Sequence, residues 1–239
     1  MSPKRAASGE AVPGGVWLRE PGPASRAPAL TRERIVAAAV GVLDAGGTEG
    51  LSMRRLADAL GVHATSLYWH VAHRDDLLDL ALDAVFGEVA LPAAPAQSWR
   101  AEIGAFMGEL RAALLRHPWS AALAVSRPLL GPNALAHSES VYAALARAGL
   151  AGLDLRAAAA AVSTYVIGSA AAEAAWRNQG AAAARSAVND HLRRNADRYP
   201  TLAAHAVTGE EDWEAHFARG ADAFLAGLAT PRPAGPATR

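Results

Sequence analysis

The sequence contains no cysteine, which excludes a disulfide framework and metal sites built from thiolates. It also carries no net charge, because 23 lysine and arginine residues balance 23 aspartate and glutamate residues. This balance argues against a large nonspecific footprint on nucleic acid, although a compact domain making few phosphate contacts remains compatible with it. No apolar run reaches the roughly 20 residues of a membrane helix, since the longest, residues 157–175, is mostly alanine with polar interruptions. We therefore expect a cytoplasmic protein without a membrane partner.

Recognisable catalytic patterns are missing as well. The sequence has no glycine-rich phosphate loop, no His-Glu-x-x-His and no Gly-x-Ser-x-Gly. Residues 137–139 are histidine, serine and glutamate, but neighbours on one helix point in different directions, so a surface helix is expected there. His70 and His73 could ligate a metal with Asp76, yet this set lacks further ligands. The sequence therefore predicts no enzymatic activity, no cofactor and no metal site.

The stretch 50–82 carries the strongest pattern in the chain. Ser52 is a good N-cap for a short helix whose apolar face is Leu56, Ala57 and Leu60. Gly61 ends that helix at a position that tolerates left-handed backbone, and a second short helix, about 63–70, follows with Leu67 turned inward. This spacing predicts a helix-turn-helix, although short turns between amphipathic helices are common and need not bind DNA.

The outward residues of this motif suit DNA. The first helix of such a motif crosses the backbone, and the N-terminal half of the second enters the major groove. Small and hydroxyl-bearing residues let the second helix approach closely and donate to phosphates or base edges, while an arginine suits guanine or phosphate. The predicted DNA-binding residues are Ser52, Met53, Arg54, Ala64, Thr65, Ser66, Tyr68, His70 and Arg74.

The same stretch resembles the DNA-binding domain of the TetR family of bacterial repressors. The resemblance rests on Leu67-Tyr68-Trp69-His70-Val71, on the charged step 73–76 and on the Leu77-Leu78 pair that opens the next helix. It covers about residues 30–86 well and continues more faintly toward the C-terminus. The sequence of residues 67–71 is similar to that of the tetracycline repressor's own subgroup. The resemblance implies a three-helix DNA-binding domain followed by a helical domain that binds an effector and dimerises.

We accordingly predict an all-α fold with a helix-turn-helix DNA-binding domain at 30–90 and a helical effector-binding and dimerisation domain at 97–229. The segments 1–29 and 230–239 are expected to be disordered tails, given their proline, glycine and alanine content. Within the first tail, the apolar island 16–19 is open to three interpretations. It folds back onto the DNA-binding domain, it belongs to a basic arm with Arg19 and Arg26, or its tryptophan is incidental.

Capping residues and periodicity predict the helices. The first runs from Thr31 to about Ala45, where Gly46-Gly47 stop it, and the one after the helix-turn-helix runs over about 74–89. Further helices are expected at about 99–116, 119–125, 133–148, 155–178 with Asp154 as N-cap, and 210–228. The stretch 180–208 reads as a variable loop with some helix.

Aromatic and apolar residues of the second region provide the walls that a small-molecule pocket needs. The candidates are Trp99, Phe106, Met107, Leu110, Trp119, Tyr142, Tyr165, Glu173 and Trp176. The alternative, for any one of them, is a plain core residue. The resemblance does not extend to magnesium-bound tetracycline, because residues 88–90 and 123–125 lack the histidines that such a site implies, and Glu173 alone is weak evidence.

The sequence thus predicts a sequence-specific homodimeric repressor of a palindromic operator, released by a small-molecule effector. The helices at 155–178 and 210–228 are suited to pair with those of a second copy as a four-helix bundle, as the resemblance implies, although they could instead form an internal core. A ligand-blind DNA-binding dimer, in which the second domain serves only dimerisation, is the alternative function.

Overall fold

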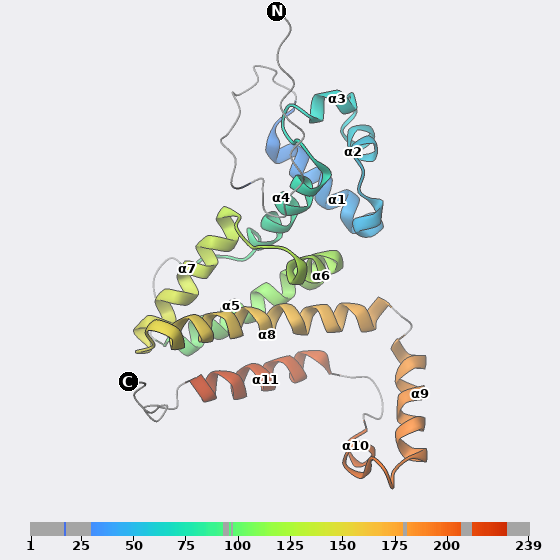
Figure 1. Ribbon diagram of the computed structural model, residues 1–239, viewed down its shortest axis with the longest axis vertical. Coiled ribbons are helices and arrows are strands. Elements are labelled where there is room, and N and C mark those ends of the chain that lie inside the picture. The colour runs from blue at the N-terminus through green and yellow to red at the C-terminus, as the bar shows by residue number, and fades with distance from the viewer. Residues whose placement is uncertain are drawn as a thin grey trace, which may run out of the picture. The chain divides into compact units, whose positions relative to one another are not determined.

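The computed structural model of the protein describes residues 17, 30–92, 96, 98–178, 181–206 and 212–228. Every regular element in this part of the chain is a helix, which confirms the predicted all-α class (Figure 1). Packing divides the chain into two units. The first comprises Met1–Leu91 with Arg116–Val141, and the second comprises Pro92–Leu115 with Tyr142–Arg239.

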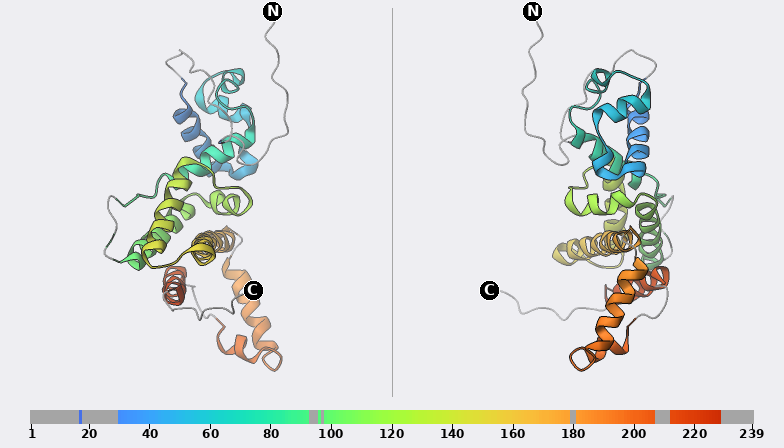
Figure 2. Two further views of the ribbon diagram at one scale, coloured as in Figure 1. Left: turned by 60° about the vertical axis from the view of Figure 1, so that its left-hand side comes forward. Right: turned by 90° about the vertical axis from the view of Figure 1, so that its right-hand side faces the viewer.

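The first unit is a bundle arranged around α4. Its helices are α1 (Arg32–Gly50), α2 (Met53–Leu60), α3 (Ala64–Leu67), α4 (Arg74–Phe86), α6 (Pro118–Ser126) and the first part of α7 (Pro132–Arg147). The α1 helix packs against α2, α4 and α6, and α4 also packs against α6 (Figure 2). The predicted apolar stripe of α4 is buried throughout, namely Leu77, Leu78, Ala81, Leu82, Val85 and Phe86.

Three aspartates are buried on the same helix, and each has polar partners. Asp76 accepts hydrogen bonds from the backbone N–H groups of Ala72 and His73, at 3.2 and 3.1 Å. Asp79 pairs with Arg127 at 2.6 Å. Asp83 accepts from the backbone N–H of Ala134 at 2.9 Å in the first turn of α7, and burial raises the pKa of its carboxyl. These bonds satisfy groups that would be costly to bury alone, and those of Asp79 and Asp83 tie α4 to the end of α6 and the start of α7.

The predicted caps of the first unit are confirmed. Thr31 and Ser52 accept from backbone N–H groups three residues on, and Gly61 is left-handed with φ 66°. The predicted helix ends need correction. The α1 helix does not stop at Gly46-Gly47 but resumes to Gly50, because Gly47 adopts φ 61° and forms a kink within it. The second helix of the motif covers only Ala64–Leu67, and α4 ends at Phe86.

The second unit is built mainly from five further helices. These are α5 (Trp99–Arg116), α8 (Gly152–Asn178), α9 (Ala181–Arg194), α10 (Pro200–Ala204) and α11 (Trp213–Leu228). The α8 and α11 helices run alongside each other and are in contact, and α10 packs on α9 (Figure 1). The bounds of α5 match the prediction. In contrast, α8 begins at Gly152, so Asp154 lies in its first turn instead of capping it.

The predicted domain limits, 30–90 and 97–229, stay a prediction. By packing, residues 116–141 group with α1–α4, because α6 packs on α1 and α4. The expectation that no stretch is apolar enough for a membrane helix needs correction. The stretch Gly152–Arg177 of α8 is long and apolar enough by length and composition alone, as core helices of soluble proteins can also be.

The predictions for 1–16, 18–29 and 230–239 lie outside the described residues. Trp17 is described and lies on the first unit. The guanidinium carbon of Arg32 is 5.9 Å from the centre of the Trp17 ring. The Trp17 side chain also borders a small cavity together with Leu82 and Phe86 of α4. Among the three interpretations of the tryptophan, this contact favours folding back.

Candidate nucleic-acid interface and ligand cavity

The helix-turn-helix is held by a tight turn at Gly61. The N–H of Gly61 donates to the carbonyls of α2, and the N–H of Val62 donates to Ala57 O at 3.0 Å. Leu67 is fully buried and anchors α3. This arrangement satisfies the last carbonyls of α2 and fixes the direction in which α3 leaves the turn.

The candidate DNA-binding residues differ in exposure. Arg54, Thr65 and Tyr68 are exposed, Tyr68 by 55% of its surface. Ser52, Met53, Ala64, Ser66, His70 and Arg74 are half-buried. Trp69, which the sequence analysis quoted only as part of the resemblance, is 86% exposed. A large apolar side chain that is so exposed next to α3 belongs to the outer surface of the motif, and its exposure is the signal that adds it to the candidate residues.

Two arginines of the motif are engaged inside the unit. Arg74 donates from Nε to Leu51 O at 2.9 Å and from Nη2 to Thr48 O. Arg55 donates from Nη1 to Gly50 O at 3.1 Å. Both therefore hold the segment between α1 and α2. Ser52 likewise uses its hydroxyl oxygen to accept from Arg55 N at 3.2 Å. These bonds stabilise the motif, and they limit what Arg74 can offer to a phosphate.

A histidine bridge joins three segments of the first unit. His117 Nδ1 lies 2.8 Å from Asp44 of α1, and its Nε2 lies 2.8 Å from Glu88, which follows α4. Trp119 donates its indole N–H to the same Asp44 oxygen at 2.7 Å, and Arg116 pairs with Glu88 at 2.6 Å. Burial would lower the pKa of His117, but its hydrogen bonds to the two carboxylates outweigh burial and raise it.

This bridge predicts a pH-dependent stability. Because the pKa of His117 is raised in the folded protein, the stabilisation is fully present below its ordinary value of 6.5 and is lost as the pH rises through the folded value. The free energy of unfolding should therefore decrease as the pH rises from 6.5 through the folded pKa of His117. The His117→Gln variant should not show this decrease. Urea titrations at a series of pH values provide the measurement. His205→Gln, at an exposed position, is the control and should keep the wild-type profile.

The residues weighed for catalysis serve the fold. His137, expected on a surface helix, is instead buried, and its Nε2 lies 3.0 Å from Phe86 O. Ser138 donates to Ala134 O at 2.9 Å within its own helix. Over the described ranges, no group of three or more histidine, aspartate or glutamate side chains is placed to hold a metal ion.

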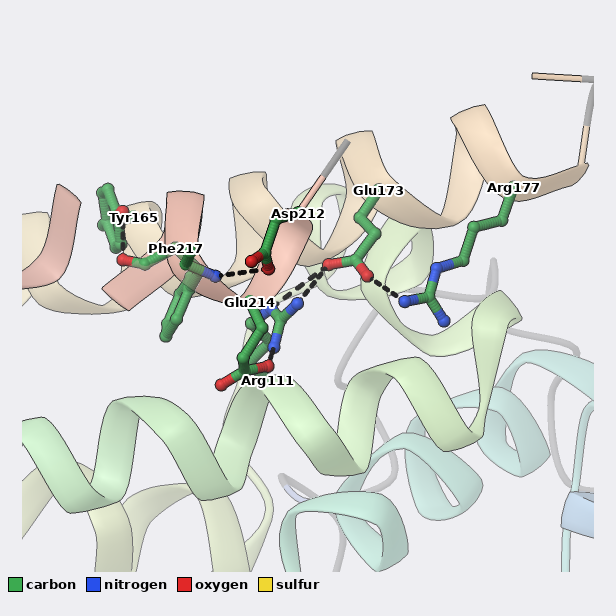
Figure 3. Close-up of polar contacts among 8 residues, drawn as sticks. Arg111, Tyr165, Glu173, Arg177, Asp212, Glu214 and Phe217 are labelled. Atoms are coloured by element: carbon green, nitrogen blue, oxygen red, sulfur yellow. Dashed lines mark hydrogen bonds and ion pairs between the residues drawn. The ribbon is translucent and has the colours of Figure 1, made fainter. Parts of the chain in front are cut away.

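A cavity of ≈ 200 Å³ lies among α5, α8 and α11 of the second unit. It is lined by Arg111, Tyr165, Ser169, Ala172, Glu173, Trp213, His216 and Phe217. The Tyr165 hydroxyl donates to Phe217 O at 2.9 Å, and burial raises the pKa of Tyr165 (Figure 3). The walls thus combine three aromatic rings, those of Tyr165, Trp213 and Phe217, with charged and polar groups, as in small-molecule sites.

An ionic network forms one side of this cavity (Figure 3). Arg111 donates from Nε and Nη2 to Glu173 Oε2, at 3.2 and 2.7 Å. Its Nη1 pairs with Glu214, at the start of α11. The other oxygen of Glu173 faces the guanidinium of Arg177 as an ion pair. The guanidinium of Arg111 also lies over the ring of Phe217, 4.9 Å from its centre.

The structure brings two of the nine predicted pocket residues, Tyr165 and Glu173, to this cavity. Trp119 belongs to the first unit, where its indole is bound to Asp44. The remaining candidates divide between buried Met107 and Leu110, half-buried Trp99 and Phe106, and exposed Tyr142 and Trp176. Sequence reasoning missed Arg111. Its signal was an arginine within the apolar stripe of α5, four residues after Met107.

Comparisons with known proteins agree with this architecture. The family model described as "Tetracyclin repressor-like, C-terminal domain" matches residues 91–232, and the one described as "Bacterial regulatory proteins, tetR family" matches residues 35–81. An HTH-type transcriptional regulator of Saccharopolyspora erythraea is 56% identical over 225 residues, which cover 94% of this chain and 95% of the relative. The transcriptional repressor DrrR1 of Streptomyces coeruleorubidus is 42% identical over 60% of this chain and 53% of its own length.

Solved structures extend the likeness to the fold. The TetR family protein ActR of Streptomyces coelicolor, in complex with actinorhodin, superposes with a TM-score of 0.75 at 35% identity, covering 84% of this chain and 97% of ActR. The two family models together match most of the described helices of both units, and the relatives are transcriptional regulators. The chain belongs to the TetR family of helix-turn-helix transcriptional regulators.

Proposed function

We propose that this regulator is a homodimeric repressor that binds a palindromic operator and is released from it by a small-molecule effector. The exposed surface of α2–α3, with Arg54, Thr65 and Tyr68, is the observation that carries the DNA-binding part of the proposal. Exposed hydroxyl, phenol and guanidinium groups beside a tight turn suit base edges and phosphates. In this proposal the protein acts in the cytoplasm, has no catalytic role and requires no cofactor or metal.

The aromatic cavity of the second unit supports the effector part. Ligand-bound ActR, in complex with actinorhodin and with (S)-DNPA, supports an effector role by analogy. An effector that prefers one of two spacings between the recognition helices shifts the population toward that spacing and lowers operator affinity. A ligand-blind dimer is the competing function, and effector screening against a bound operator separates the two.

The exposed face of α8 supports the dimer. Small apolar residues recur along it at helical spacing, and they are Ala157, Ala160, Gly168 and Ala175. Such residues permit close approach of a second helix. A single helix-turn-helix binds one half-site. In a two-fold symmetric dimer, the second helix-turn-helix binds the other half-site about one DNA turn away. The contact between α8 and α11 within one protomer also supports an internal role for part of α11.

The test of the proposed function is selection from a random pool of DNA duplexes by the purified protein at near-physiological salt. Enrichment of one palindrome is the expected result, and sedimentation of the protein with that duplex should give two chains per site. Failure to enrich any sequence would count against a sequence-specific reader. The selected palindrome then becomes the probe for effectors.

Arg54→Ala should weaken binding to this palindrome by about 1–3 kcal/mol if the arginine reads a base edge. Titrations of labelled operator and of scrambled DNA measure the effect. Equal losses on both sequences would make Arg54 a phosphate contact. Arg194→Ala, at an exposed position on α9, is the matched control and should leave both affinities unchanged.

A further inference from the structure

The ionic network beside the cavity contains two carboxylates with unequal environments: Glu173 lines the cavity, and Glu214 lies outside its lining and pairs with Arg111, which does line it. Glu173 is 1% exposed and faces two guanidinium groups, those of Arg111 and Arg177. Glu214 is 78% exposed, yet its carboxylate reaches Arg111, whose side chain is only 6% exposed. Figure 3 shows Glu214 approaching Arg111 from the start of α11, while Glu173 comes from α8. One side of the buried arginine is therefore held by a buried partner and the other by a partner that solvent can reach.

We propose that the cavity is a site for a small aromatic acid, and that Glu214 occupies the place of the ligand's acidic group on Arg111. This inference rests on the proposed effector function and specifies the chemical class of the effector. On binding, the ligand's acid group takes the Nη1 side of Arg111, and the Glu214 side chain moves into the solvent. Glu214 is thus an intramolecular competitor of the ligand.

The charges at the site favour an acid over a base. Exchanging one carboxylate for another keeps Arg111 paired and leaves the pair with Glu173 intact, so no buried charge is left without a partner. A cationic ligand entering the same space would meet the guanidinium of Arg111, and the lining carboxylate, Glu173, is already paired with two guanidinium groups. The planar guanidinium can also hold a carboxylate through parallel hydrogen bonds.

The walls and size of the cavity favour a flat ligand of limited extent. Tyr165, Trp213 and Phe217 present aromatic rings to the space. Its volume of ≈ 200 Å³ is below the roughly 300–1,000 Å³ of sites for drug-sized ligands. One or two fused rings fit this description, and larger ligands would need to extend past the exposed His216 into solvent.

Naphthoate and naphthamide form a matched pair of probes, because they share the ring system and differ in the charge of one group. We expect naphthoate to bind the wild-type protein about tenfold more tightly than naphthamide, as charged hydrogen bonds exceed neutral ones by this order. Glu214→Gln should tighten naphthoate binding by up to about fivefold, the worth of a partly exposed ion pair. The affinity for naphthamide should stay constant. Ligand-observed NMR titration measures both.

Glu109→Gln is the matched control, because Glu109 is an exposed carboxylate on α5, two residues from Arg111. It removes the same charge from the same unit and should leave both affinities unchanged. Equal thermal midpoints by circular dichroism would show that the variants are folded. Equal binding of the two probes, or naphthoate binding that Glu214→Gln does not tighten, would overturn the inference.

The operator selected above separates this inference from the proposed function. Each probe is added to the protein–operator complex, and DNA release is followed by fluorescence anisotropy. If naphthoate binds more tightly than naphthamide but does not release the operator DNA, the result supports the acid site and counts against its role as an effector site. Operator release by naphthamide and naphthoate alike, unaffected by Glu214→Gln, would support the repressor function and overturn the acid site.

Discussion

Arg111→Met should lower the free energy of unfolding of the second unit by about 3–5 kcal/mol, the cost of breaking a buried ion pair on one side. The substitution removes both hydrogen bonds to Glu173 Oε2 and leaves that carboxylate 1% exposed with only Arg177 as a partner. The ring of Phe217 also loses the cation above it. Urea unfolding followed by circular dichroism measures the loss.

The double variant Arg111→Met/Glu173→Met distinguishes an unpaired charge from lost packing. The double variant replaces both charged side chains, so neither is left buried without a partner. Most of the lost stability should return, because buried ion pairs are often replaced by apolar residues at little cost. Arg194→Met, on the exposed face of α9, should have no effect. A double variant as unstable as the single one would show that the packing of the arginine stem, and not the orphaned carboxylate, dominates.

The second large effect is expected at Gly131, which precedes α7. A Cβ atom there would lie 2.1 Å from Asp83 Oδ1 and 2.6 Å from Asp83 Cβ, so an alanine forces the buried aspartate off the first turn of α7. Overpacking costs about 1–3 kcal/mol and a lost cap about 0.5–2 kcal/mol. Gly131→Ala should therefore lower the free energy of unfolding of the first unit by about 2–4 kcal/mol in urea titrations.

Gly108→Ala is the control for this substitution. An added Cβ at Gly108 meets nothing within 4 Å, and the residue lies inside α5, where alanine is favoured over glycine by roughly 0.5–1 kcal/mol. The two substitutions should thus change stability in opposite directions. If Gly131→Ala left the unfolding midpoint in place, the close approach of the loop to Asp83 could not be the reason for glycine there.

Local signals explain how much of the fold the sequence predicts. Thr31, Ser52 and Gly61 act within one turn of helix, and the structure confirms all three roles. The bounds of α5 also match, because Ser98 and His117-Pro118 delimit an uninterrupted apolar period. Gly46-Gly47 failed as a stop signal, since a glycine that can take positive φ permits a kink as readily as an end.

Long-range partners explain what the sequence does not predict. Trp119 suits a pocket wall by its type, but its indole binds Asp44, 75 residues away, in the first unit. The pairing of Arg111 with Glu173 spans 62 residues and has no local signature. In the candidate nucleic-acid interface, the spacing of the helix-turn-helix predicted which side chains are exposed. Their contact with DNA stays a prediction. The cavity depended on which helices pack together.

The α8 helix carries apolar residues on its exposed face as well as on its buried one, where Val162, Val166 and Ile167 lie. Its carboxylate Glu173 is inside, against Arg111, while alanines and glycine face outward along much of its length. In the proposed dimer, the partner's surface covers that hydrocarbon, so assembly contributes to the folding free energy of each chain. The stability of each chain then depends on the protein concentration in the cell, as does the fraction of operator that is occupied. In the proposed dimer, each chain is therefore least stable at low protein concentration, where the dimer dissociates.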